Sequence, residues 1–204
     1  MARSSDTPEG RLANVSAALL LGGASSRMGR DKSRVRVGGL PLATHTARML
    51  EDLFEEVLLV GGEPPEDAPG RRVEDPAGPR CALRGLVAAL AAAREERVLL
   101  VATDMPLLTP DLLLALTAWP EHDAVMPRDA AGQHPLCAIY RREPVLAAAR
   151  ERLAAGELSL GALADGLDCG FVEGPDLEAL DPRGQVLSNV NTPDDLARVE
   201  SLLA

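Results

Sequence analysis

Short apolar runs that alternate with helix-like segments set the strongest limit on how this chain can fold. The first run covers Val15 to Leu21, the second lies within EEVLLVGG (residues 55–62) and the third within RVLLVATDMP (residues 97–106). These runs are apolar at successive positions, which is typical of strands buried on both faces. They predict an α/β fold with a mostly parallel sheet and helices on both faces, and such sheets bind ligands at the carboxyl ends of their strands.

Segments with helical spacing fill the intervals between these runs. Thr109 and Pro110 supply an N-cap and a proline at the first helical position, and Thr192 and Pro193 repeat this pattern near the C-terminus. Helices are expected over residues 41–53, 83–93, 109–119, 143–155, 160–165 and 192–203, and short strands around residues 73, 123–128, 135–140 and 169–173.

A chain of 204 residues with 46% hydrophobic content is long enough for one domain with a complete core. We expect a single domain over residues 15–204. The preceding segment, MARSSDTPEGRLAN, is polar and has no apolar stretch typical of a secretory signal, so residues 1–14 are predicted to form a flexible tail.

The charge and residue composition disfavour several classes of function. The net charge of -10 repels nucleic acids and acidic membrane surfaces at long range, and an aromatic content of 2% leaves little for base stacking. No apolar segment approaches the roughly 20 residues that a membrane-spanning helix needs. Cys81, Cys137 and Cys169 are widely spaced without a CxxC motif, which favours neither disulfides nor zinc and fits the cytoplasm.

The stretch LLLGGASSRMGRDK follows the first predicted strand and is the strongest candidate for a phosphate-binding loop. Gly22 and Gly23 allow a sharp turn whose N–H groups can bind phosphate oxygens, and Arg27 and Lys32 add positive charge. A glycine turn flanked by solvated basic residues explains the same pattern equally well. The spacing matches neither the P-loop nor the G-x-G-x-x-G fingerprint of dinucleotide-binding folds.

Two carboxylates follow predicted strands and could serve a phosphate ligand. Asp104, in VATDMP, ends the third apolar run, and Mg²⁺ prefers one or two carboxylates together with phosphate oxygens. Asp75, in VEDPAGP, follows the short strand at Val73. The alternative for each is an ordinary turn residue beside a proline.

Polar residues in the second half of the chain are weaker candidates. Helix capping explains Thr192 and Pro193 in SNVNTPDDL, but it does not explain Asn189 and Asn191, which could also be turn residues. His134, in GQHPLCA, could be an ordinary surface residue. The serines and cysteines form no recognisable pairing of nucleophile and base, so covalent catalysis is not expected.

These motifs together carry a resemblance to a known family. LLGGASSRMGRDK resembles the signature of the molybdenum cofactor guanylyltransferases, L-x-G-G-x-S-x-R-M-G-x-D-K, and the likeness extends from about Ala18 to Leu196. The Gly-Gly pair and the MG-x-DK ending are more similar to guanylyl than to cytidylyl enzymes. GPRCALRG replaces the family's usual GPLAG, which puts the role of Gly85 in question.

The resemblance implies a Rossmann-like nucleotidyltransferase fold and transfer of GMP from MgGTP to molybdopterin, with release of pyrophosphate. It also implies transient contact with molybdoenzymes or other cofactor-biosynthesis proteins. The nucleotide-binding residues that it implies are Leu20, Leu21, Gly22, Gly23, Arg27, Lys32, Asp75 and Asp104, of which Arg27, Lys32 and Asp104 are catalytic and Asp104 holds Mg²⁺. The acceptor-binding residues are Asn189, Asn191 and His134.

Other functions remain open from the sequence. Base choice rests on the signature, so a cytidylyltransferase acting on molybdopterin or another phosphate acceptor is the first alternative. A non-enzymatic GTP-binding accessory module would keep the glycine loop without needing Asp104. A nicotinamide oxidoreductase would need an acidic residue directly after the second strand, where the chain offers only Glu63 beyond two glycines.

Overall fold

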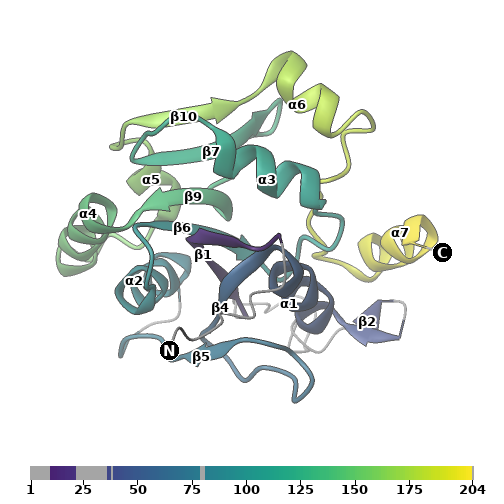
Figure 1. Cartoon of the computed structure of the whole chain (residues 1–204), viewed down its shortest axis with the longest axis horizontal. Helices are drawn as coiled ribbons and strands as arrows, with labels where there is room; N and C mark the ends of the chain where they lie inside the picture. Colours follow the sequence, from purple (N-terminus) through teal and green to yellow (C-terminus); the bar gives the residue numbers. More distant parts are fainter. Residues whose placement is uncertain (1–9, 22–35, 38, 79–80, 204) are drawn as a thin grey trace, which may run out of the picture.

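One mixed sheet forms the centre of the molecule (Figure 1). The computed structural model describes residues 10–21, 36–37, 39–78 and 81–203. The strands of this sheet are β1 Leu12–Leu20, β4 Phe54–Val60, β5 Arg71–Val73, β6 Arg97–Ala102, β7 Ala124–Asp129, β8 Gly132–Gln133, β9 Cys137–Arg141 and β10 Cys169–Val172. They follow the order β10-β7-β9-β6-β1-β4-β5, with β8 paired to β7. A separate hairpin joins β2 Arg36–Val37 to β3 Leu40–Pro41.

Most neighbouring strands of the sheet are parallel, as the apolar runs predict. β1 is parallel to β4 and β6, β4 is parallel to β5, and β7 is parallel to β10. β9 differs because it runs antiparallel to both β6 and β7. The carboxyl ends of β1, β4, β5, β6, β7 and β10 therefore share one edge of the sheet, where β9 begins.

Helices cover both faces of the sheet (Figure 1). Helices α1 Leu42–Leu53, α3 Pro110–Ala118 and α6 Gly174–Leu180 pack on one face. Helices α2 Ala82–Ala92, α4 Arg142–Ala154 and α5 Leu160–Ala164 pack on the other. The remaining helix, α7 Pro193–Leu203, lies beside β2.

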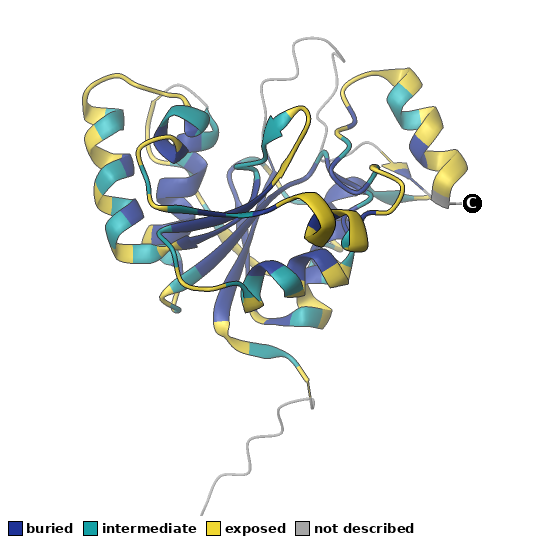
Figure 2. Cartoon of the chain, turned by 90° about the horizontal axis from the view of Figure 1, so that it is seen from above, coloured by how far each residue is buried: buried dark blue, intermediate teal, exposed yellow. Residues whose placement is uncertain are grey.

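Strand β1 shows why successive apolar positions predict this arrangement. Ala17 and Leu19 belong to the apolar cluster under α1 and α3, whereas Ala18 and Leu20 belong to the cluster under α2 and α4. Successive side chains point to opposite faces, so a strand covered on both sides is apolar at most of its positions. The buried centre of the sheet is visible in Figure 2.

The structure differs from the sequence expectations at the start of the first strand and in several short elements. Strand β1 begins at Leu12, which is in register with Phe54 of β4, so residues 12–14 form part of a strand rather than of the predicted tail. Strand β8 and helix α6 were not expected, because each is short and β8 depends on pairing with β7. Residues 1–9 of the predicted tail lie outside the described residues.

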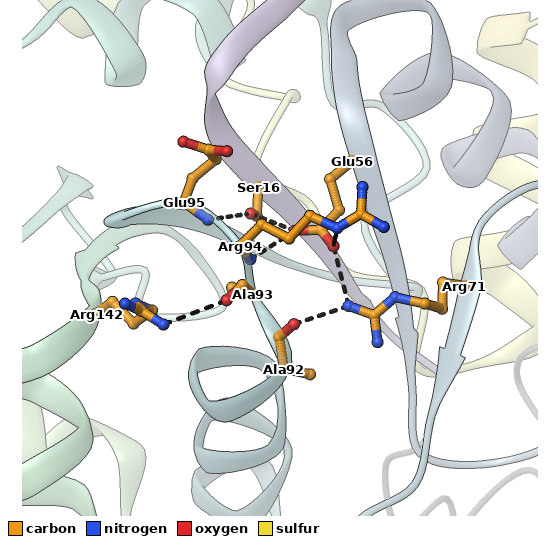
Figure 3. Close-up of polar contacts among 8 residues, drawn as sticks. All are labelled: Ser16, Glu56, Arg71, Ala92, Ala93, Arg94, Glu95 and Arg142. Carbon is orange, nitrogen blue, oxygen red and sulfur yellow. Dashed lines mark hydrogen bonds and ion pairs between the residues drawn. The ribbon is translucent and has the colours of Figure 1, made fainter.

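A buried carboxylate joins the strands near their amino-terminal ends (Figure 3). Glu56 of β4 is 8% exposed and accepts hydrogen bonds from Ser16 Oγ of β1 at 2.6 Å and from the Arg94 N–H at 2.8 Å. Arg71 of β5 completes the group with an ion pair of 2.9 Å to Glu56. Burial alone would raise the pKa of Glu56, but these hydrogen bonds and the positive charge of Arg71 lower it below its ordinary value.

Candidate functional site

The ends of three parallel strands are fastened together where the predicted phosphate loop begins. The carbonyl oxygen of Leu20 accepts hydrogen bonds from the Thr103 N–H at 3.2 Å and from Thr103 Oγ1 at 2.6 Å. The Leu21 N–H donates to the carbonyl oxygen of Val60 at 3.0 Å. Because the Leu20 and Leu21 side chains are buried in the core, these two predicted nucleotide-binding residues can reach a ligand only through their backbone.

Four of the predicted site residues belong to the segment that follows β1. Gly22, Gly23, Arg27 and Lys32 lie within residues 22–35, outside the described part of the chain. The structure does fix where this segment must start and finish. It leaves the end of β1 at Leu21 and returns at Arg36, the first residue of β2.

Asp75 lies against the end of β4, as expected for a side chain that follows a parallel strand. The N–H of Gly61 donates to the carbonyl oxygen of Val73 at 2.9 Å, which holds the ends of β4 and β5 together. A Cβ atom added to Gly61 would lie 2.6 Å from Asp75 Oδ2, and Gly61 has a φ of +67°. Glycine is therefore needed here for the backbone conformation and for the close approach of the carboxylate.

The structure brings Asp104 together with the C-terminal segment that contains the two asparagines. The N–H of Val190 donates a hydrogen bond of 2.8 Å to the carbonyl oxygen of Asp104. Asn189 and Asn191 are exposed, whereas Val190 between them is 1% exposed. Val190 therefore anchors the segment, and the two amide side chains remain accessible beside the end of β6.

Hydrogen bonds at the start of helix α7 hold the C-terminal end of the same segment. Asp195 Oδ2 accepts hydrogen bonds from the N–H groups of Asn191 at 3.0 Å and Thr192 at 2.9 Å, and the Asp195 N–H donates to Thr192 Oγ1 at 3.1 Å. These bonds lower the pKa of Asp195, with the bond from the Asn191 N–H contributing most. The reciprocal bonds match the capping box that often begins a helix, with aspartate in place of glutamate.

His134 also lies at this edge of the sheet, and its ring is fixed by a partner that the sequence did not reveal. Its Nε2 lies 3.0 Å from Asp129 Oδ2, and its backbone N–H donates to the carbonyl oxygen of Pro127 at 3.0 Å. Burial would raise the pKa of Asp129, but bonds from His134 and the Ala131 N–H lower it. The Ala102 N–H donates to the Leu136 carbonyl oxygen at 3.0 Å, which places this turn beside the end of β6.

A cavity of about 450 Å³ opens between the end of β7, helix α6 and the loop that follows it. Arg128 lines it, forms an ion pair with Glu173 and lies 3.8 Å above the centre of the Phe171 ring. Its other lining residues include Asp129, Leu177, Glu178, Asp181 and Leu187. This cavity has little signature in the sequence, because its walls come from separate short segments rather than from one motif.

Arg84, in the part of the unusual GPRCALRG segment that begins helix α2, contacts both the residue that precedes the segment and its first glycine. Arg84 Nη1 donates to the carbonyl oxygen of Ala77 at 2.6 Å, and the Arg84 guanidinium lies against Gly78. Gly85 lies within helix α2, where an added Cβ would come within 2.7 Å of the Leu20 side chain. Gly85 thus allows helix α2 to pack closely on strand β1.

The described residues fit a magnesium ion that is held largely by its substrate. Within the ranges that the structure describes, no three His, Cys, Asp or Glu side chains gather as a metal site of their own. Mg²⁺ commonly needs only one or two carboxylates when phosphate oxygens and water supply the other ligands. Asp104 is half-buried at the end of β6 with its backbone fixed by Val190, which suits this task.

Comparison with known proteins identifies the family. Residues 17–165 match the MobA-like NTP transferase domain. The chain belongs to this family. A probable molybdenum cofactor guanylyltransferase of Chloroflexus aggregans is 38% identical over 200 residues, which span 93% of this chain and 95% of that protein. The molybdenum cofactor guanylyltransferase of Cereibacter sphaeroides is 33% identical over 196 residues, with 91% and 95% of the two chains covered.

Solved structures of nucleotidyltransferases share the fold. The molybdopterin-guanine dinucleotide biosynthesis protein A of Archaeoglobus fulgidus superposes with a TM-score of 0.79 at 22% identity, covering 92% of this chain and 98% of that one. A 2-C-methyl-D-erythritol 4-phosphate cytidylyltransferase of Thermus thermophilus gives a TM-score of 0.67 at 19% identity, covering 91% and 97%. The expected family and Rossmann-like nucleotidyltransferase fold are confirmed.

Family membership also decides against the nicotinamide oxidoreductase. Glu63, the acidic residue that such an enzyme would need, is exposed and forms an ion pair of 3.4 Å with Arg72.

Among the described helices, none has both the length and the apolar character that a membrane span requires.

Proposed function

We propose that this chain transfers GMP from MgGTP to molybdopterin, releasing pyrophosphate and forming the guanine dinucleotide form of the cofactor. The names of the family's curated relatives support this activity. The structural observation that carries it is the hydrogen bond between Val190 and Asp104, because it sets the acceptor-side segment against the strand end proposed to hold the metal.

The reaction needs positioning and charge stabilisation more than covalent chemistry from the protein. A terminal phosphate oxygen of molybdopterin attacks the α-phosphorus of GTP in line. A new P–O bond forms as the bond to the bridging oxygen of the β-phosphate breaks, and pyrophosphate leaves with that electron pair. When bound, Mg²⁺ neutralises negative charge on the phosphate oxygens.

The proposed roles on the nucleotide side follow from the signature and from the strand ends. The N–H groups of Gly22 and Gly23 bind phosphate oxygens, Arg27 holds the β- and γ-phosphates, and Lys32 stabilises charge near the α-phosphate. Asp104 holds Mg²⁺ and Asp75 contacts the nucleotide. Preference for guanine over cytosine rests on the signature.

The proposed acceptor side lies next to the end of β6. The exposed amides of Asn189 and Asn191 can donate and accept hydrogen bonds with the pterin or its phosphate. His134, held by Asp129, lies at the start of the turn that reaches the end of β6. The three residues come from two segments, residues 189–191 and the turn that begins at His134, and both segments lie beside the end of β6.

Pyrophosphate release tests the proposal. The purified chain is incubated with each of the four NTPs and Mg²⁺, with and without molybdopterin. We expect release with GTP that depends on molybdopterin. Release with CTP instead would move the protein to the cytidylyl branch, release with another phosphate acceptor only would replace molybdopterin, and Mg²⁺-independent GTP binding without release would support an accessory module.

A further inference from the structure

A third, small apolar cluster lies apart from the two that cover the faces of the sheet. Val37, Leu42, Val190 and Val199 are its buried members, at 4%, 1%, 1% and 3% exposure, with Leu107 and Leu196 packed against it. Helix α7, which carries Val199, lies beside β2 (Figure 1). The cluster therefore joins segments that are far apart in sequence, and one of them contains Asn189 and Asn191.

Val190 connects this cluster to the site directly. Its side chain is buried in the cluster, its N–H bonds the Asp104 carbonyl oxygen at 2.8 Å, and its neighbours Asn189 and Asn191 are exposed. How deeply the Val190 side chain is buried in the cluster therefore determines where both amides lie relative to the end of β6.

Helix α7 contributes Val199 to the cluster that contains Val190, with Leu196 of the same helix packed against it. Leu196 and Val199 are three positions apart and so lie on one face of the helix. Val199 is 3% exposed, whereas Leu202 on the same helix is 39% exposed. Removing the two γ-methyl groups of Val199 would leave a void in the cluster that holds Val190, and the side chains of the cluster would relax around it.

We propose that Val199 is a positioning residue for the acceptor, acting through Val190 on the segment of residues 189–191. This inference rests on the proposed function, because it takes that segment as the acceptor side. Val199 touches neither substrate. It holds the two amides in register with Asp104, and an error of about 1 Å in such registration can cost up to 100-fold in rate.

The test compares Val199→Ala with Val145→Ala in the full-length chain. Val145 of helix α4 is completely buried in the cluster under α2, α4 and α5. The same change there therefore gives a comparable loss of packing away from the site. We expect both variants to lower the melting temperature. Only Val199→Ala should raise the KM for molybdopterin, by about fivefold, with the KM for GTP changed by less than about twofold. Equal acceptor KM values in the two variants would overturn the inference.

Removing both amides shows whether Val199 acts through the asparagines. If it does, adding Val199→Ala to the variant that carries Asn189→Ala and Asn191→Ala should leave its acceptor KM nearly unchanged. Independent, multiplicative effects would overturn the inference while leaving the proposed function intact. Absence of molybdopterin-dependent pyrophosphate release from the unmodified chain would overturn both together, so the two failures are distinguishable.

Discussion

The N–H of Val190 donates a 2.8 Å hydrogen bond to the carbonyl oxygen of Asp104. This bond fastens the C-terminal segment to the end of β6, although the two are separated by most of the second half of the sequence. It uses only backbone atoms, so it persists when the Asp104 side chain is changed. The carboxylate of Asp104 can therefore be tested separately from the position of its backbone.

Asp104→Asn should reduce kcat strongly while leaving the fold in place. The amide keeps the size of the carboxylate but lacks the negative charge that Mg²⁺ requires, so we expect kcat at fixed Mg²⁺ to fall about 100-fold or more. The melting temperature should change little. Pyrophosphate release over a Mg²⁺ titration measures the effect, and a variant with near-normal kcat and Mg²⁺ dependence would contradict the assignment.

Lys32→Ala should cut turnover far more than it changes folding. Its ammonium group is proposed to stabilise charge near the α-phosphate, and loss of one such group typically costs about 100- to 1000-fold in kcat. Arg30→Ala is the matched control, since Arg30 is a cation in the same stretch without an assigned role. Similar kcat values for the two variants would show that only the overall charge of the stretch matters.

Apolar patterning was enough to predict the strands that position the site. β1, β4 and β6 are buried on both faces over most of their length, so their sequences are apolar at successive positions, and the carboxyl ends of parallel strands meet at one edge. The placement of Asp104 and Asp75 at this edge follows from that rule.

Contacts made only by tertiary structure could not be predicted in this way. The direction of β9 depends on how its connection crosses the sheet, which no local pattern records. Asp129 reads as a turn residue until the pairing of β7 and β8 brings it to His134. Glu56 reads as a polar residue at a strand start, and its burial depends on Ser16 and Arg71 from other strands.

Gly61→Ala should weaken nucleotide binding by displacing Asp75. The new Cβ would lie 2.6 Å from Asp75 Oδ2, so the carboxylate must move, and the φ of +67° adds backbone strain of about 1 kcal/mol. Gly156→Ala carries a similar strain at φ +79° with no atom within 4 Å of the new Cβ. We expect a rise of at least about threefold in the KM for GTP in Gly61→Ala only. An equal KM in both variants would separate Asp75 from nucleotide binding.

Glu56→Gln should destabilise the fold in a pH-dependent manner without involving the site. The carboxylate is 8% exposed and is bonded by Ser16, the Arg94 N–H and Arg71, so its loss should lower the free energy of unfolding by about 2 kcal/mol at neutral pH. Because the folded-state pKa lies below the ordinary 4.5, this stabilisation is complete above pH 4.5 and disappears as the pH falls through the folded-state pKa. Urea unfolding should therefore show a gap between wild type and variant that is largest at neutral pH and narrows below about pH 4.5. Glu55→Gln, which changes the exposed neighbour on β4, should show little loss at either pH. A gap that stayed constant with pH would mean that packing, rather than the charge of Glu56, stabilises this part of the sheet.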